Sequence, residues 1–313
     1  MLIPVVLLLA GLILLTLGAD RFVVAAARLS RILGLSPILI GALVIGLGTS
    51  APELLVSALA AGRGELDLAL GNVVGSNTAN MTLVLGAAAL VGPVVSQVKT
   101  IRREGVLMFL GLLGLTAMLW DLRLTRFGGA MLLFGMAGAA VLLVLWARSD
   151  PRAEMVTEAT AGEAPPSAAR ESLIGLGMLA LTLLGADLLV RGASGLAEEL
   201  GISEAFVGLV IVAIGTSLPE LATAMAAARR GETDLIVGNV LGSNLFNTLM
   251  VVGTATLIGP GGVDSSFRSA LVFMVGAGVA AGVFVATGKK LARWEGAVLL
   301  GVFVAFIAVA GRA

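Results

Sequence analysis

Long apolar runs constrain the fold of this 313-residue chain more than any other feature of its sequence. A bilayer core about 30 Å thick is crossed by a helix of roughly 20 apolar residues. The chain is 58% hydrophobic and 13% charged, and that charged share is about half of what a soluble domain carries. We therefore expect an all-α membrane protein with ten transmembrane helices. The ten expected spans lie near residues 2–27, 36–61, 68–92, 104–120, 127–147, 171–195, 203–228, 235–258, 267–287 and 293–311.

The composition also narrows the chemistry that the chain can perform. It contains no His and no Cys, which removes imidazole bases, thiol nucleophiles and the usual ligands of zinc. Carboxylate, amide, hydroxyl and backbone carbonyl oxygens remain as ligands. Because nothing supplies an activated nucleophile, we expect neither an enzyme nor a cofactor. The 20 basic and 20 acidic residues cancel, so we expect no nucleic-acid partner.

A hydrophilic stretch divides the chain into two halves. Residues 148–170, rich in Ala, Glu and Pro, are expected to form a flexible linker between a five-helix repeat over 1–147 and a second over 171–313. With the N-terminus outside, the inside loops hold 13 Lys and Arg residues and the outside segments hold 5. Positive residues concentrate in cytoplasmic loops. We therefore expect a multi-pass plasma (inner) membrane protein with both termini outside and the linker in the cytoplasm.

The two halves carry the same motif. A shift of 167 positions aligns residues 48–86 with 215–253 without a gap and gives 22 identities in 39 pairs. The first copy reads G-T-S-A-P-E at 48–53 and G-N-V-V-G-S-N at 71–77, and the second reads G-T-S-L-P-E at 215–220 and G-N-V-L-G-S-N at 238–244. Because each half has an odd number of spans, the second copy enters the membrane from the opposite side. Inverted repeats of this kind are typical of secondary transporters.

Proline interrupts the helices that carry the first part of each motif. Pro52 and Pro219 cannot donate the helical hydrogen bond to the carbonyls of Gly48 and Gly215. Irregular backbone at membrane depth is tolerated where it is buried in protein or lines a polar cavity. We expect spans two, three, seven and eight to be interrupted helices that meet at a midplane site.

Two glutamates lie in the middle of the second and seventh spans. An ionised carboxylate at this depth costs about 2.5 to 3.5 kcal/mol on insertion scales, and no Lys or Arg lies near Glu53 or Glu220 in either span. Helical spacing places Thr49 and Ser50 on the face of Glu53. The remaining polar positions with the same spacing are Ser76, Asn80, Thr216, Ser217, Ser243 and Asn247. Together these groups predict a cage of hard oxygens with two carboxylates.

Calcium is the cation that such a cage fits best. Ca²⁺ takes about six to eight oxygens at flexible geometry, and two carboxylates match its charge. Na⁺ suits the same ligands singly. Mg²⁺ is a poorer fit because it keeps its waters and demands a tight octahedron.

G-T-S-x-P-E followed by G-N-V-x-G-S-N-x-x-N, present in each half, resembles the alpha-repeats of the sodium/calcium exchanger family within the cation/Ca²⁺ antiporter superfamily. The resemblance implies that spans one and six slide over a core of spans two, three, seven and eight. It also implies that Glu53 and Glu220 are acidic ligands and that Asn80 is the central amide. Family members often have Asp where this chain has Asn247, which makes this site less negative. The other ligands that the resemblance implies are Thr49, Thr216, Ser50, Ser217, Ser76, Ser243, Gly46 and Ala213.

The function that we expect is exchange of Na⁺ for Ca²⁺ by alternating access, with Ca²⁺ extruded from the cytoplasm by a protein that works as a monomer. A proton/Ca²⁺ or K⁺-dependent antiporter on the same fold stays open as an alternative. A passive cation channel is an alternative of a different class.

Other polar and small residues have structural interpretations. Asp20 with Arg21, and Asp187 with Arg191, are expected to form structural or gating pairs. Glycines such as Gly46 allow close helix packing. The asparagines expected to hold the broken helices are Asn72, Asn77, Asn239 and Asn244.

Overall fold

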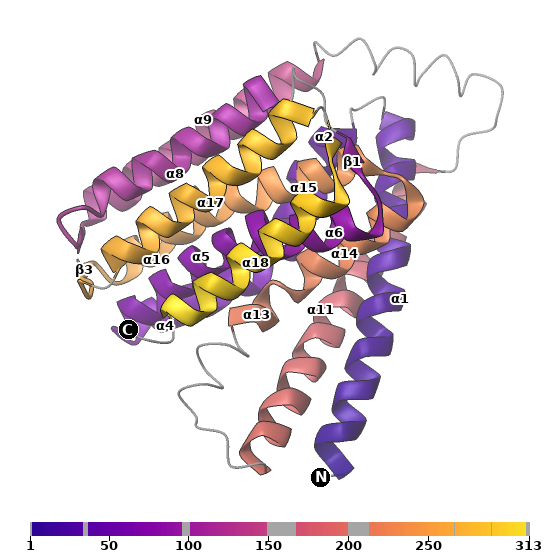
Figure 1. Ribbon diagram of the computed structural model, residues 1–313, viewed down its shortest axis with the longest axis horizontal. Helices are drawn as coiled ribbons and strands as arrows, with labels where there is room; N and C mark the ends of the chain where they lie inside the picture. Colours follow the sequence, from indigo (N-terminus) through magenta and orange to yellow (C-terminus); the bar gives the residue numbers. More distant parts are fainter. Residues whose placement is uncertain are drawn as a thin grey trace.

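The chain is almost entirely helical in the computed structural model (Figure 1). The described residues are 2–33, 37–95, 101–148, 167–199, 213–265, 267–288 and 290–310. Two short antiparallel strand pairs join distant loops. They are β1 (Val94–Val95) with β4 (Lys290–Leu291), and β2 (Arg123–Leu124) with β3 (Gly261–Gly262).

Six of the described helices are long and apolar enough to cross a membrane, or seven if one bent pair counts as a single span. They cover Leu2–Leu29, Leu66–Val91, Arg126–Trp146, Ala168–Gly192, Thr233–Ile258 and Phe267–Ala286, and the bent pair is Ile38–Thr49 with Ala51–Gly62. Shorter helices lie at two further expected spans: η3 (Ile101–Gly105) with α8 (Val106–Met118), and α18 (Arg293–Ala310). Residues 203–212 of the expected span 203–228 and most of the linker 148–170 lie outside the described residues, so the count of ten stays a prediction.

The first helix of each half forms one long pair. α1 (Leu2–Leu33) and α11 (Ala168–Glu199) pack along each other and stand at an angle to the other helices (Figure 1). Glycine makes this approach possible, because a Cβ on Gly18 would lie 2.8 Å from the backbone nitrogen of Thr182. The pair lies beside the rest of the bundle and packs against it through buried residues of α1 such as Phe22 and Val23.

The third helix of each half lies in the centre of the protein. In the most apolar 18-residue stretches of the spans Leu66–Val91 and Thr233–Ile258, 78% and 89% of the stretch is buried. The corresponding share for the first helix is 22%. The central helices comprise α5 (Leu66–Ala79), η2 (Asn80–Val84), α6 (Leu85–Val91), α15 (Thr233–Phe246), η5 (Asn247–Val251) and α16 (Val252–Ile258). They are flanked by α9 (Arg126–Arg148) and α17 (Phe267–Gly288).

The second helix of the first half is broken as the proline predicts. It comprises α2 (Pro37–Ile40), η1 (Gly41–Gly46) and α3 (Leu47–Thr49), followed by α4 (Ala51–Gly62). The chain bends by 43° at Ser50, two residues before Pro52. In the second half α13 (Ala213–Thr216) ends and α14 (Leu218–Arg230) begins on either side of Ser217.

The third helix of each half differs from the prediction of an interrupted helix. Both run as continuous helices, over Leu66–Val91 and Thr233–Ile258. Neither segment contains proline, so the backbone keeps its hydrogen bonds. The irregularity is a π-helical turn instead, which begins at Asn80 in one copy and at Asn247 in the other. Such turns are frequent at functional sites.

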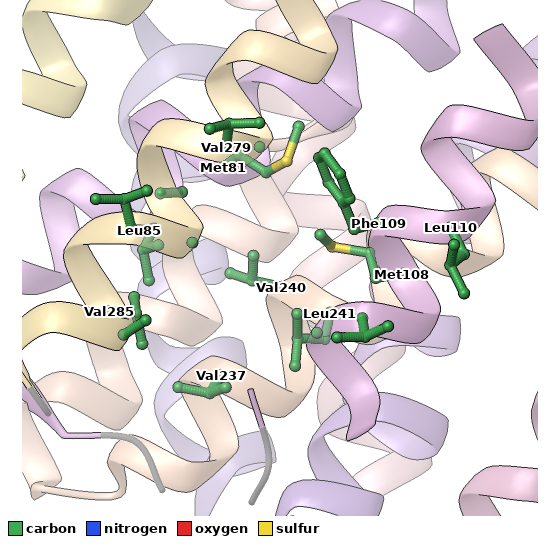
Figure 2. A pocket seen from close by; sticks show the side chains of 17 residues that line it. Met81, Leu85, Met108, Phe109, Leu110, Val237, Val240, Leu241, Val279 and Val285 are labelled. Carbon is green, nitrogen blue, oxygen red and sulfur yellow. The ribbon is translucent and has the colours of Figure 1, made fainter. Parts of the chain in front are cut away.

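A cavity of about 420 Å³ lies between η2, α6, α8, α15 and α17 (Figure 2). Its lining is apolar throughout and includes Met81, Leu85, Phe109 and Val240. Without an oxygen ligand, this cavity does not fit a cation.

The close packing of η1 on α15 makes a stability prediction. A Cβ on Gly41 would lie 2.8 Å from the backbone oxygen of Leu235, and overpacking of this kind typically costs about 1–3 kcal/mol. We expect Gly41→Ala to lower the melting temperature of the detergent-purified protein. Gly114→Ala is the matched control, because a Cβ there meets nothing within 4 Å. Equal melting temperatures for the two variants would contradict the assigned packing.

Candidate cation-binding site

The two helix breaks and the two central helices meet at one place. η1 and α3 pack on α15, and α13 packs on α5. Ten predicted ligand side chains lie here, and none is more than 7% exposed. They are Thr49, Ser50, Glu53, Ser76, Asn80, Thr216, Ser217, Glu220, Ser243 and Asn247. The structure thus brings both copies of the motif together.

The two glutamates are fully buried and have no basic partner among the described residues. Glu53 lies in the first turn of α4 and Glu220 in the first turn of α14, with exposed fractions of 0% and 1%. A helix N-terminus favours a negative charge, which explains this placement in part. The ion pairs resolved among the described residues all lie elsewhere. Two ionised carboxylates at one buried site would also repel each other, so a cation between them would relieve both the cost of burial and the repulsion.

Hydroxyl and amide groups surround the carboxylates in two related sets. Thr49 Oγ1 lies 3.4 Å from Asn239 Oδ1, and Thr216 Oγ1 lies 3.1 Å from Asn72 Oδ1. Each of these contacts joins one half to the other. Ser50 Oγ donates a hydrogen bond of 2.9 Å to Glu220 Oε1. The cage is therefore built from both repeats and exists only when they are folded together.

Asn72 and Asn239 hold the helix starts in place, as their structural interpretation predicts. Asn72 Nδ2 donates to the backbone oxygen of Glu53 at 3.3 Å, and Asn239 Nδ2 donates to that of Glu220 at 3.4 Å. Their Oδ1 atoms accept from the threonines of the opposite repeat. Asn72 and Asn239 were not among the predicted ligands. Their identical place in the two copies of the motif nevertheless indicated a role at the site.

Among the described residues, several buried polar atoms of this site have no hydrogen-bond partner. Both oxygens of Glu53 and Oε2 of Glu220 are unpartnered. The amides of Asn80 and Asn247 are unpartnered as well. Buried polar side-chain atoms in native proteins nearly always have a partner. So many orphaned oxygens in one place indicate a site for a ligand that supplies positive charge.

The structure describes the surroundings of Gly46, one of the two predicted backbone ligands, and only part of those of Ala213, the other. The carbonyl of Gly46 faces the site and accepts a hydrogen bond of 3.2 Å from Ser243 Oγ. A Cβ on Gly46 would lie 2.9 Å from the backbone nitrogen of Ser243, so glycine also permits this close approach. Ala213 is the first residue of α13, and its neighbours on the N-terminal side lie outside the described residues.

The chemistry of the donors favours a hard cation held mainly by neutral oxygens. Among the described residues, no group of three or more Asp, Glu, His or Cys side chains could hold a metal. The site therefore has two carboxylates, and amides, hydroxyls and carbonyls must supply the other ligands. Such a set suits Ca²⁺ or Na⁺ better than a transition metal.

The structure corrects one of the two predicted ion pairs. Asp187 binds Arg191 at 2.7 Å, as predicted. Asp20, however, binds Arg230 of α14 instead of its neighbour Arg21. Adjacent residues on a helix point in different directions, whereas Arg230 approaches from another helix and donates from Nε and Nη2.

Fold and site together define a helical protein with membrane-capable spans and a buried cluster of oxygen-bearing side chains, assembled from two copies of one motif. A family model described as sodium/calcium exchanger protein matches residues 3–146 and 172–311. The chain belongs to the sodium/calcium exchanger family, which is a family of transporters.

Individual relatives agree with this assignment. The chain is 30% identical over 338 residues to the sodium/calcium exchanger MaX1 of Methanosarcina acetivorans, covering 96% of this chain and 97% of the relative. It is 40% identical over 268 residues to the inner membrane protein YrbG of Escherichia coli, covering 84% and 82%. A solved structure of the sodium–calcium exchanger NCX_Mj, soaked with Na⁺ and Sr²⁺, superposes with a TM-score of 0.86 at 29% identity and 98% coverage of both chains.

The orphaned carboxylates make a binding prediction. Ca²⁺ that binds only the folded protein stabilises it, by about 2.7 kcal/mol at a concentration 100 times the Kd. We expect Ca²⁺ to raise the melting temperature of the purified protein, and Glu220→Gln to remove most of that rise. Glu65→Gln, at an exposed position, is the matched control. An undiminished rise in the Glu220 variant would contradict the site.

Proposed function

We propose that this protein is a secondary antiporter that exchanges Na⁺ for Ca²⁺ and extrudes Ca²⁺ from the cytoplasm. The observation that carries the proposal is the pair of buried glutamates, one from each copy of the motif, without a basic partner among the described residues. The membership of the chain in the exchanger family supports it. The proposed ligands are the twelve residues that the motif indicates, with Glu53 and Glu220 supplying the charge.

Electrostatics explains how such a site couples two ions. An empty site would carry two negative charges through the membrane interior, where each is costly. One Ca²⁺, or several Na⁺ ions, neutralises these charges and permits the site to change sides. Exchange then follows, because the protein moves between its two states only when loaded.

The central amides set the charge of the site. Asn80 and Asn247 lie in the two π-helical turns, and both amides are buried without partners. With an amide at Asn247 instead of a carboxylate, the site keeps two negative charges and matches one Ca²⁺. Binding of more than two Na⁺ per Ca²⁺ would make transport electrogenic.

We also propose the placement of the chain in the membrane. The Lys and Arg distribution of 13 to 5 supports both termini outside and the linker in the cytoplasm of a multi-pass plasma membrane protein. Residues 1–147 and 171–313 are then two inverted five-helix repeats, and the complete site lies within one chain. A monomer therefore suffices for transport.

Flux in proteoliposomes tests the choice of driving ion. We expect an outward Na⁺ gradient from Na⁺-loaded vesicles to drive ⁴⁵Ca²⁺ uptake, because Na⁺ and Ca²⁺ compete for the same oxygens. Uptake driven only by a pH gradient would replace this proposal with proton/Ca²⁺ exchange. Uptake without any counter-ion, insensitive to Na⁺ on the opposite side, would indicate a channel.

The two glutamates are expected to be individually essential. Glu53→Gln or Glu220→Gln removes half of the charge that holds Ca²⁺, so ⁴⁵Ca²⁺ uptake should fall to the level of empty vesicles while the protein still folds. Glu65→Gln, measured in parallel and reconstituted in equal amount, should transport normally. If both site variants retained uptake, the proposed ligands would be wrong.

A further inference from the structure

One ion pair joins the long helix of the first repeat to a helix of the second. Asp20 of α1 accepts hydrogen bonds from Arg230 at the end of α14, at 3.0 Å from Nε and 2.6 Å from Nη2. Both oxygens of the carboxylate are engaged, which fixes the geometry of the pair. Unlike Glu53 and Glu220, which are buried, both residues of this pair are partly exposed to solvent.

The internal repeat supplies the same two residue types at the related positions. The shift of 167 residues takes Asp20 to Asp187 and takes Arg63 to Arg230. A second pair, between Asp187 and Arg63, would therefore be the symmetric counterpart of the first. Its members also belong to opposite repeats, because Arg63 follows α4 and Asp187 lies in α11.

This second pair is not formed in the structure. Asp187 binds Arg191, one turn further along α11, at 2.7 Å. Arg63 is exposed and makes no ion pair with any of the described residues. The two repeats therefore differ in conformation at their related ends.

The ion site is asymmetric as well. Ser50 donates to Glu220 at 2.9 Å. The counterparts of these residues under the same shift are Ser217 and Glu53, and no hydrogen bond joins these two, because the Ser217 hydroxyl has no partner among the described residues. Two separate parts of the molecule thus show that the first repeat and the second repeat are in different states.

We propose that Asp20–Arg230 and Asp187–Arg63 are alternating contacts, each of which holds one of the two end states of transport. In an inverted repeat, exchanging the conformations of the two halves converts one facing state into the other. A contact between the halves in one state then has its counterpart in the other. The inference rests on the proposed alternating access, and these four residues position the helices without touching the ion.

The repeat also shows why the two contacts are unequal. The position related to Arg191 is Val24. Asp187 therefore has a second partner within its own helix, whereas no arginine lies one turn after Asp20. Competition from Arg191 weakens the Asp187–Arg63 contact and favours the state in which Asp20 binds Arg230.

Cross-linking tests whether both contacts form. The chain has no Cys, so introduced thiols are the only reactive ones. The two test proteins are Asp20→Cys with Arg230→Cys, and Arg63→Cys with Asp187→Cys. Each pair spans the linker 148–170, so a protease site inserted there separates the halves on a gel unless a short methanethiosulfonate cross-linker joins them.

We expect both pairs to cross-link in membranes, and each cross-link to stop transport until a reductant removes it. Arg63→Cys with Arg230→Cys is the matched control. These two positions are related by the repeat and belong to different proposed contacts, so they should not cross-link with each other. If the Arg63/Asp187 pair never cross-links with Na⁺, with Ca²⁺ or with neither, while the Asp20/Arg230 pair does, the proposal is overturned. This outcome differs from failure of the proposed function, which the flux assay alone reports.

A second measurement tests the role of Arg191. Exposed ion pairs change an equilibrium by about two- to fivefold. We expect Arg191→Val to reduce the population of the state in which positions 20 and 230 are in contact, relative to the other state, by this factor. The readout is slower cross-linking of the Asp20→Cys/Arg230→Cys pair. Arg123→Gln, which removes an exposed arginine from β2, should leave the rate unchanged. An unchanged rate in the Arg191 variant would refute the competition.

Discussion

The burial of two carboxylates, with no basic partner in the part of the chain that the structure describes, is the constraint on which the rest of this structure depends. Glu53 and Glu220 are surrounded by protein on all sides, and each must be stabilised by polar groups or by a bound cation. The helix breaks at Ser50 and Ser217 place each carboxylate at a helix N-terminus. Hydroxyl and amide groups from both repeats complete the cage.

The same constraint links stability to transport. Oxygens that lack partners among the described residues make the empty site unfavourable, and in the proposed function the same oxygens bind the ion. The central helices remain continuous around the site, while the pair of α1 and α11 stands beside them at an angle (Figure 1).

Much of this arrangement was predictable from local rules. Proline cannot continue a helix in the usual way, so Pro52 and Pro219 indicated the two breaks. The recurrence of the motif with a shift of 167 residues indicated that both glutamates belong to one site. The continuous π-helical turns at Asn80 and Asn247 were not predictable, because a π-turn depends on the hydrogen bonds that neighbouring helices leave available and has no residue signature as strong as proline.

The sequence by itself determined the class of protein, the repeated motif and the two carboxylates that we propose as ligands, because apolar length, proline and repeated polar residues act locally. Only the tertiary structure decided which groups face each other. It showed Asn72 and Asn239 holding the helix starts across from the threonines of the opposite repeat. It also paired Asp20 with Arg230, which is 210 residues away. Such contacts depend on how helices pack in three dimensions, and spacing along the chain does not encode them.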